Sequence, residues 1–281
     1  MAAGSERAKR CVGVPPSNAK INYKQLMAEL FGRNYKKGAT SVPFTRDQIV
    51  EFAATMKMDR PDNLGDLIYS FRYRTKMPDS ITATAPKGKE WVIIGAGNAK
   101  YKFQLFDAAQ IIPRKDMEPV KIPRATPEIV IRYARSEEQA LLAVVRYNRL
   151  VDMFLGVSAY SLQSHLKTKV PNIGQIEIDE VYVGVNKQGA QFIIPVQAKG
   201  GNDKLGIVQV MQDAEFCKNM FPDLVPRLIA AQFIDDNHVA MLELVVTETG
   251  AKIRQEQHYL LVAADKISSA DLKSYRSSVP D

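Results

Sequence analysis

The stretch that decides the fold runs from Gly174 to Gly201 and reads GQIEIDEVYVGVNKQGAQFIIPVQAKGG. Two runs rich in β-branched residues flank the segment NKQG at positions 186–189, which is typical of a hairpin turn. The pattern therefore predicts two antiparallel strands, over residues 175–185 and 191–197.

Three polar side chains in this hairpin form a candidate hydrolytic site. Asp179 lies in the first strand, and Gln197 and Lys199 end the second, two positions apart and therefore on one face. Antiparallel pairing can bring all three to one end of the sheet. A carboxylate and an amide oxygen can hold a hard divalent cation, and a nearby lysine can help to orient and deprotonate water. The structural alternative is an ordinary exposed Asp–Lys ion pair, which stabilises a fold very little.

The order acid, strand, turn, strand, acid-x-Lys resembles the motif of the PD-(D/E)XK nuclease superfamily, which includes restriction endonucleases and DNA repair nucleases. Here Ile178-Asp179 supplies the first acid, and Gln197-Ala198-Lys199 takes the (D/E)-x-K position. Glutamine replaces the second acid, as in the Mrr-type restriction nucleases, which also join an N-terminal winged helix to a nuclease domain. The motif covers roughly residues 137–215.

The resemblance implies a restriction-endonuclease-like mixed sheet flanked by helices, with a catalytic site that depends on Mg²⁺ or Mn²⁺. Asp179 and Gln197 would be the metal ligands. It also implies in-line attack of water on phosphorus, which leaves 5′-phosphate and 3′-hydroxyl ends. Glu138, or its neighbour Glu137, is the implied auxiliary carboxylate at the start of the preceding helix. Carboxylates at a helix start also stabilise the helix dipole, so a purely structural role is the alternative.

A break in the alternation of the first strand leaves open which acid faces the metal. Ile176 and Ile178 are even-numbered, whereas the valines from Val181 onward are odd-numbered. A bulge or twist near Asp179–Glu180 would explain the break, and bulges recur beside active sites. Asp179 is the favoured ligand.

Further side chains around the hairpin are candidates for contact with substrate. His165 and Lys167 precede the hairpin and are predicted to reach DNA phosphates. Gln209, on the helix expected after the second strand, resembles a polar residue found there in relatives. Three histidines and no paired cysteines make a zinc site improbable.

The upstream residues predict a separate DNA-binding domain. Helical periodicity over 21–32, a capping box that begins at Thr45 and an asparagine cap at Asn63 predict three helices. Residues 90–94 and 101–106 are predicted to form a hairpin. Three short helices followed by a hairpin is the layout of a winged helix domain, whose last helix enters the major groove.

Basic and aromatic side chains near the third helix and the hairpin are the predicted DNA contacts. Guanidinium groups can grip phosphates or read guanine edges with two hydrogen bonds. The predicted contacts in this domain are Arg72, Tyr73, Arg74, Lys76 and Lys100.

Charge is unevenly divided along the chain. Residues 1–125 carry 22 Lys and Arg against 12 Asp and Glu, or +10, whereas residues 126–281 carry 16 against 19, or −3. A basic first half favours contact with a polyanion such as double-stranded DNA.

Length and composition fit a two-domain α/β globular protein. The chain has 281 residues, of which 46% are hydrophobic and 25% are charged. It contains no apolar run of about 18 residues and no secretory signal pattern, so we expect a cytoplasmic protein without membrane contact. The expected division is a flexible arm at 1–20, a winged helix domain at 21–110, a linker at 111–127 and a nuclease domain at 128–281.

The second domain is expected to hold several further elements. Ser136 can cap a long helix that runs from Glu137 to about Phe154 and is closed by Gly156. Further strands are expected at 227–234, 239–247 and 253–262, and further helices at 205–217 and 269–275.

These features together predict a Mg²⁺-dependent DNA endonuclease, expected to be a restriction enzyme of bacterial or phage defence. Cutting both strands needs two active sites, so a homodimer is expected. One alternative is a repair or junction-resolving nuclease that selects DNA structure rather than sequence. The other is a non-catalytic DNA-binding regulator with a decayed nuclease fold, of which Gln197 would be a sign.

Overall fold

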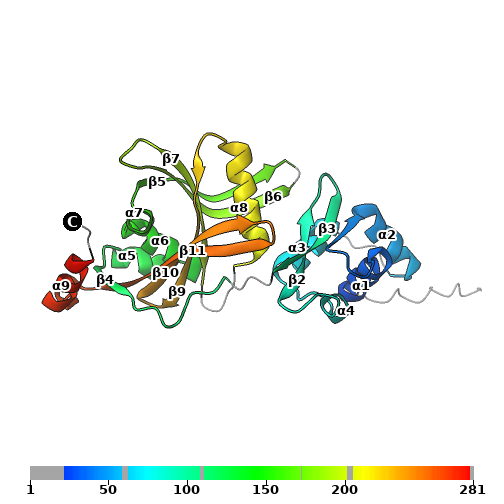
Figure 1. Cartoon of the computed structure of the whole chain (residues 1–281), viewed down its shortest axis with the longest axis horizontal. Coiled ribbons are helices and arrows are strands. Elements are labelled where there is room, and N and C mark those ends of the chain that lie inside the picture. Colours follow the sequence, from blue (N-terminus) through cyan, green and yellow to red (C-terminus); the bar gives the residue numbers. More distant parts are fainter. Residues whose placement is uncertain (1–21, 59–62, 108–110, 172, 201–204, 279–281) are drawn as a thin grey trace, which may run out of the picture.

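The computed structural model describes residues 22–58, 63–107, 111–171, 173–200 and 205–278. This part of the chain is mixed α/β, with a small sheet in its N-terminal part and a large curled mixed sheet, flanked by helices, in its C-terminal part (Figure 1). The expected arm at 1–20 lies outside the described residues. In the described ranges, no helix is both long enough and apolar enough to cross a membrane.

In the described residues up to Asp107, the N-terminal part has four helices and a three-stranded antiparallel sheet. Its elements are α1 Tyr23–Asn34, β1 Ser41–Thr45, α2 Arg46–Thr55, α3 Leu64–Tyr73, α4 Asp79–Thr82, β2 Lys89–Gly95 and β3 Lys100–Asp107. The strand order is β1-β3-β2. The three expected helices and the hairpin are confirmed, whereas β1 and the short α4 were not predicted.

Local capping sets where two of these helices begin. The Thr45 hydroxyl accepts from the Gln48 N–H at 3.3 Å and the Gln48 side chain accepts from the Thr45 N–H at 3.0 Å, which completes the expected capping box. Asn63 caps α3 by accepting from the backbone N–H groups of Gly65 and Asp66.

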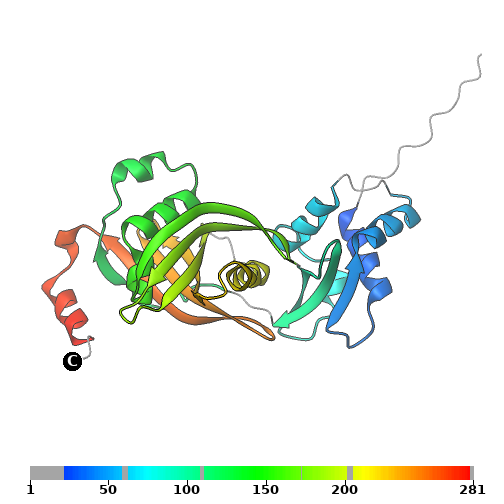
Figure 2. The same cartoon turned by 90° about the horizontal axis from the view of Figure 1, so that it is seen from above.

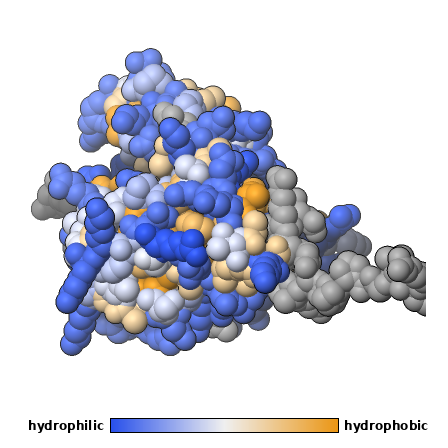
Figure 3. Space-filling view, turned by 90° about the vertical axis from the view of Figure 1, so that its right-hand side faces the viewer, coloured by the Kyte–Doolittle hydropathy of each residue, from blue (hydrophilic) through white to orange (hydrophobic). Residues whose placement is uncertain are grey.

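The surface at the N-terminal end of the molecule is largely hydrophilic, with only small hydrophobic areas (Figure 3).

The C-terminal part is built on one large sheet. Its elements are β4 Val120–Pro123, α5 Glu128–Tyr133, α6 Glu137–Tyr147, α7 Leu150–Leu155, β5 Ser158–Val170, β6 Gly174–Val185, β7 Gln191–Lys199, α8 Ile207–Met220, β8 Val225–Pro226, β9 Leu228–Asp235, β10 His238–Thr247, β11 Gly250–Val262, the 3-10 turn η1 Ala264–Lys266 and α9 Ser269–Ser277. The strand order is β4-β11-β10-β9-β7-β6-β5, and the two-residue β8 pairs with β7.

The direction of the strands changes in the middle and at one edge of this sheet. β5, β6 and β7 form an antiparallel meander, and β9 then pairs with β7 in parallel after the crossover helix α8. β4 pairs in parallel with β11 at the far edge. Helices α6 and α7 cover one face, whereas α8 lies in the hollow of the curled sheet, beside the N-terminal part (Figure 2).

The prediction of a single helix from Glu137 to Phe154 is wrong, because the helix is interrupted at Asn148, between α6 and α7. The buried Asn148 side chain accepts from the Ala125 N–H at 2.6 Å and donates to Thr126 and to the Val144 carbonyl. The following residue then takes a left-handed conformation (φ 52°). Gly156 closes α7 with φ 65°, as expected for a helix end.

In the large sheet, the strands β4 and β5 and the two-residue β8 were not predicted. The edge strand β5 is polar and mostly exposed along its length, so it lacks the alternation that identifies a half-buried strand. Part of the expected linker, Val120–Pro123, forms β4. Its partner β11 lies far away in the sequence, and local residue patterns carry no information about such a pairing.

Candidate active site

Asp179 lies where strands β6 and β7 part. The two strands are paired as far as Glu180 and Val196 and separate beyond this pair. Oδ2 of Asp179 accepts from the backbone N–H of Ala198 at 2.8 Å, beyond the last pair of the β6–β7 ladder. The carboxyl group is therefore anchored at the mouth of the gap between the strands.

The expected break in the alternation of β6 is present at this point. Ile178 and Val181 pack in the same core beneath α8 although they are three positions apart. Glu180 lies on the opposite face, completely buried, where its carboxylate accepts from Arg146 at 2.9 Å and from Ser161 at 2.7 Å. Glu180 is therefore held in an ion pair on the α6 side, and Asp179 is the acid that lines a cleft.

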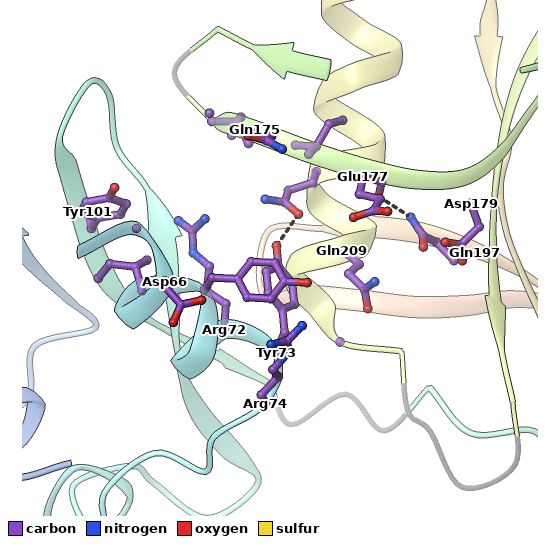
Figure 4. Close-up of a pocket in the computed structure, with 18 of the residues that line it drawn as sticks. Asp66, Arg72, Tyr73, Arg74, Tyr101, Gln175, Glu177, Asp179, Gln197 and Gln209 are labelled. Carbon is purple, nitrogen blue, oxygen red and sulfur yellow. Dashed lines mark hydrogen bonds between the residues drawn. The ribbon is translucent and has the colours of Figure 1, made fainter. Parts of the chain in front are cut away.

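Gln197 is 1% exposed and is held by hydrogen bonds on its nitrogen side. Its Nε2 donates to both carboxyl oxygens of Asp213, at 3.1 Å each. The same nitrogen donates to the backbone carbonyl of Glu177 at 3.3 Å (Figure 4). Asp213 belongs to α8 and was not identified from the sequence. Its presence had a sequence signal, because it lies three positions from both Val210 and Phe216 on the apolar face of the expected helix.

Burial and a nearby cation set the electrostatics of these acids. Burial raises the pKa of the Asp179 carboxyl, and the Ala198 N–H and the Lys199 ammonium partly oppose that effect. Burial also raises the pKa of Asp213 well above its ordinary value, while the hydrogen bond from Gln197 acts in the opposite direction. Lys199, half-buried at the end of β7, is close enough to influence both carboxyl groups.

Asp179, Gln197 and Lys199 line one wall of a cleft of about 1060 Å³ between the two parts of the protein (Figure 4). The charges are separated across it. The C-terminal wall carries three acids and one base, and the N-terminal wall carries three bases and one acid. The C-terminal charged residues are Glu138, Glu177, Asp179 and Lys199, and the N-terminal ones are Arg46, Asp66, Arg72 and Arg74.

The start of α6 lies close to the end of β7. Glu138 lines the cleft with the three hairpin residues, as expected for an auxiliary carboxylate. Its neighbour Glu137 lies against Gly200, where an added Cβ would come within 2.6 Å of the Glu137 Oε2 atom. A glycine directly after Lys199 therefore permits this close approach.

The N-terminal wall is formed largely by α3, and two of its expected DNA contacts are half-buried. The Arg72 Nε donates to the Ile93 carbonyl at 3.0 Å, and its guanidinium lies 5.5 Å from the centre of the Tyr101 ring. Burial lowers the pKa of Arg72. Tyr73 donates its hydroxyl hydrogen to the side-chain oxygen of Gln212 at 2.6 Å, which joins α3 to α8. Both side chains were predicted to contact DNA, but each is partly buried by contacts with residues distant in the sequence.

The other expected DNA contacts are exposed. Arg74 lies over the Tyr69 ring at 5.0 Å and lines the cleft, whereas Lys76 and Lys100 are exposed beyond its lining. On β5, Lys167 forms an ion pair with Glu177 at 3.1 Å.

His165 on β5 lies beside Asp179 of β6, because its neighbours Ser164 and Leu166 pair with Glu180 and Ile178. Its backbone is left-handed (φ 49°), and it lines a second cavity of about 440 Å³ together with Arg146 and Ser164. His165 does not line the cleft itself, but it is close enough to Asp179 to oppose the rise in the pKa of that carboxyl.

The hairpin residues offer oxygen atoms suited to a partly hydrated Mg²⁺ or Mn²⁺ ion. No group of three or more His, Cys, Asp or Glu side chains in the described ranges is arranged to hold a metal by itself. Mg²⁺, however, usually keeps several waters and is bound through one or two carboxylates. The Asp179 carboxyl and the Gln197 amide oxygen fit that mode of binding.

No protein-family model matches the sequence, and comparison with curated proteins and with solved structures found no significant match. What the protein does must therefore be inferred from the cleft and from the fold that builds it.

Proposed function

We propose that this protein is a divalent-metal-dependent DNA endonuclease, which binds DNA with its N-terminal part and cuts it in the cleft. One observation carries the proposal: Asp179, Gln197 and Lys199 line one wall of a cleft whose opposite wall is rich in arginine. Carboxylate, amide oxygen and ammonium are the groups that metal-assisted phosphodiester hydrolysis requires.

The topology supports the proposal. A helix, the meander β5-β6-β7, the crossover α8 and a strand parallel to β7 follow one another in the order implied by a restriction-endonuclease-like fold. In the N-terminal part, β1 joins the β2–β3 hairpin beside three helices, which favours a winged helix domain. We infer these two folds from the order and pairing of the elements.

Each residue of the C-terminal wall has a distinct proposed role. Asp179 and the Gln197 oxygen hold Mg²⁺ or Mn²⁺, which when bound supplies positive charge that offsets the charge of the phosphate. Lys199 orients the attacking water and stabilises negative charge that develops on the phosphate oxygens. Glu138 is a further oxygen ligand or a hydrogen-bond acceptor for that water.

The proposed reaction is an in-line displacement at phosphorus. The water oxygen forms a bond to phosphorus as the bond between phosphorus and the 3′ oxygen breaks. The water loses one proton to solvent, and the departing 3′ oxygen takes one up. The products are a 5′-phosphate and a 3′-hydroxyl end, and cutting both strands of a duplex requires two copies of the chain, which we expect to pair.

Cleavage of supercoiled plasmid DNA with Mg²⁺ tests the proposal. Asp179→Asn and Lys199→Ala are expected to cut at least about 100-fold more slowly than wild type, because each loses a group that acts on the reacting phosphate. Lys187→Ala is the matched control, since this exposed lysine lies in the turn at the other end of the hairpin.

Other outcomes would decide between the alternatives. Wild-type rates in Lys199→Ala would overturn the assigned site. Failure of the wild type to cut any DNA would favour a DNA-binding regulator. Cutting confined to branched or flapped DNA would identify a repair or junction nuclease rather than a restriction enzyme.

A further inference from the structure

Asp213 is a carboxyl group buried inside the protein directly behind the candidate site. It lies on α8, is 3% exposed, and accepts with both oxygens from the amide nitrogen of Gln197. Removing a carboxyl group from water is costly unless its new contacts compensate. Apart from Gln212, which binds Tyr73, the other buried residues of α8 are apolar, so a buried carboxyl at this position calls for a role.

The contacts around Gln197 fix which end of its amide faces which way. The Glu177 backbone carbonyl can only accept a hydrogen bond, so the amide atom that faces it at 3.3 Å must be the nitrogen. Asp213 accepts from the same nitrogen. The Gln197 oxygen is therefore directed away from these acceptors, on the side of Asp179 (Figure 4).

The orientation matters because the two ends of an amide have opposite polarity and similar shape. An amide that presented its nitrogen to a cation would repel it, whereas its oxygen is a usable ligand for a hard cation. A carboxylate needs no such control, since both of its ends are oxygen. Glutamine at this position of the motif therefore creates a need for an acceptor behind it.

We propose that Asp213 is a positioning residue that locks the Gln197 amide with its oxygen toward the cation. The inference rests on the proposed function, because it assigns the metal ligand of that same site. Residues that hold a metal ligand in place by a hydrogen bond typically raise the metal affinity by about 10–100-fold.

Titration of the metal-free protein with Mn²⁺, in the absence of DNA, tests the inference directly. Asp213→Leu, which has no acceptor for the Gln197 amide, is expected to bind Mn²⁺ about 10–100-fold more weakly than wild type, whereas Asp213→Asn keeps one acceptor oxygen and is expected to lose less. Asp223→Asn is the control, since this exposed aspartate lies beyond the end of α8. Melting curves without metal separate this effect from unfolding.

A polarity exchange distinguishes positioning from simple packing. Gln197→Glu alone places a second carboxyl group against Asp213, so we expect weaker Mn²⁺ binding. Adding Asp213→Asn restores a donor–acceptor pair in the reverse sense, and we expect the double variant to regain at least about tenfold over Gln197→Glu. The Glu177 carbonyl, now facing an oxygen, limits full recovery. If the two substitutions only disturbed packing, each independently of the other, their losses of Mn²⁺ affinity would add in the double variant.

The two proposals fail in distinguishable ways. Unchanged Mn²⁺ affinity in both Asp213 variants, or no binding by the wild type, would overturn the positioning role whatever the cleavage assay gives. Mn²⁺ binding that depends on Asp213, in a wild type that cuts no DNA, would retain the positioning role and refute the nuclease. DNA cutting that depends on Lys199 but not on Asp213 would retain the nuclease and refute the positioning role.

Discussion

Asp179 and Glu180 are neighbours in β6 whose carboxyl groups lie on opposite faces of the sheet. The Glu180 carboxylate accepts hydrogen bonds from Arg146 and Ser161, which offset the cost of burying its charge. Asp179 receives a backbone N–H and is otherwise disfavoured as an anion by burial. Acidic groups that lie beside a cleft and have a raised pKa are frequent at functional sites.

A pH dependence of stability follows for the metal-free protein. Burial raises the folded-state pKa of Asp179 and Asp213, so the folded chain retains protons that the unfolded chain has lost. The free energy of unfolding therefore falls as pH rises from about 4, the unfolded value, through the raised folded pKa values. Asp179→Asn and Asp213→Asn should each flatten this decline in urea titrations at a series of pH values.

Asp271 provides the opposite sign as an internal control. Hydrogen bonds from Ser268, with help from Lys121, lower the pKa of Asp271 to about 2. Its contribution is complete above about 4 and is lost as pH falls through the folded value. Asp271→Asn should therefore change only the acid end of the stability curve, and a wild-type slope in all three variants would refute the assignment.

At this scale the sequence was informative where a motif fixed the spacing. Asp179, Gln197 and Lys199 could be identified from their order in one hairpin. Asp213 could not be linked to Gln197, because that contact depends on how α8 packs on β7. The orientation of Glu180 was left open for a similar reason, since the irregularity of β6 at Asp179 is shaped by its neighbours in the sheet.

The elements show the same division between local and distant causes. Helix starts at Thr45 and Asn63 are set by side chains within three residues, and the sequence predicted both. The break between α6 and α7 depends on Asn148 meeting a segment more than twenty residues upstream, which no helical pattern records. The strand β5 was missed because its side chains are mostly exposed on both faces, so that buried and exposed positions do not alternate along it.

We expect Asn148→Ala to lower the free energy of unfolding by about 2 kcal/mol, because it leaves the Ala125 N–H without its acceptor and removes two donated hydrogen bonds. Urea denaturation measures the change. Asn219→Ala is the matched control, since this exposed asparagine contacts only its own helix turn, and its expected change is below about 0.5 kcal/mol. Equal effects of the two variants would contradict the account.

Across the whole molecule, the two parts are joined by specific contacts. Tyr73 donates to Gln212 across the cleft, the Asp107 N–H donates to the Thr249 carbonyl at 2.8 Å, and Phe106 packs in the core beneath α8. The sequence suggested two domains and a basic first half, but it gave no indication that α3 contacts α8. Such pairings join residues more than a hundred positions apart, so they carry no local pattern.

Binding of duplex DNA should depend on exposed cations of the N-terminal part. Each of Arg74→Ala, Lys76→Ala and Lys100→Ala is expected to weaken binding similarly on all sequences. Each should also reduce the slope of log affinity against log salt concentration by about 1, because one phosphate contact is lost. Fluorescence anisotropy in EDTA measures binding without cleavage. Lys273→Ala, on α9, should leave the slope unchanged. If it reduced the slope as much as the other three substitutions, the assignment of the DNA interface would be contradicted.

The pairing of β4 with β11 has a consequence for how the chain folds as it is made. β4 is the first strand of the large sheet to leave the ribosome, yet its hydrogen-bonding partner emerges some 140 residues later, by the numbering of the paired residues. The N-terminal part has its own sheet and core and can form early. The large sheet must wait with one edge strand unpaired, so its assembly should be slow and largely post-translational. During that interval a chaperone that shields unpaired strands would be expected to raise the yield of active protein.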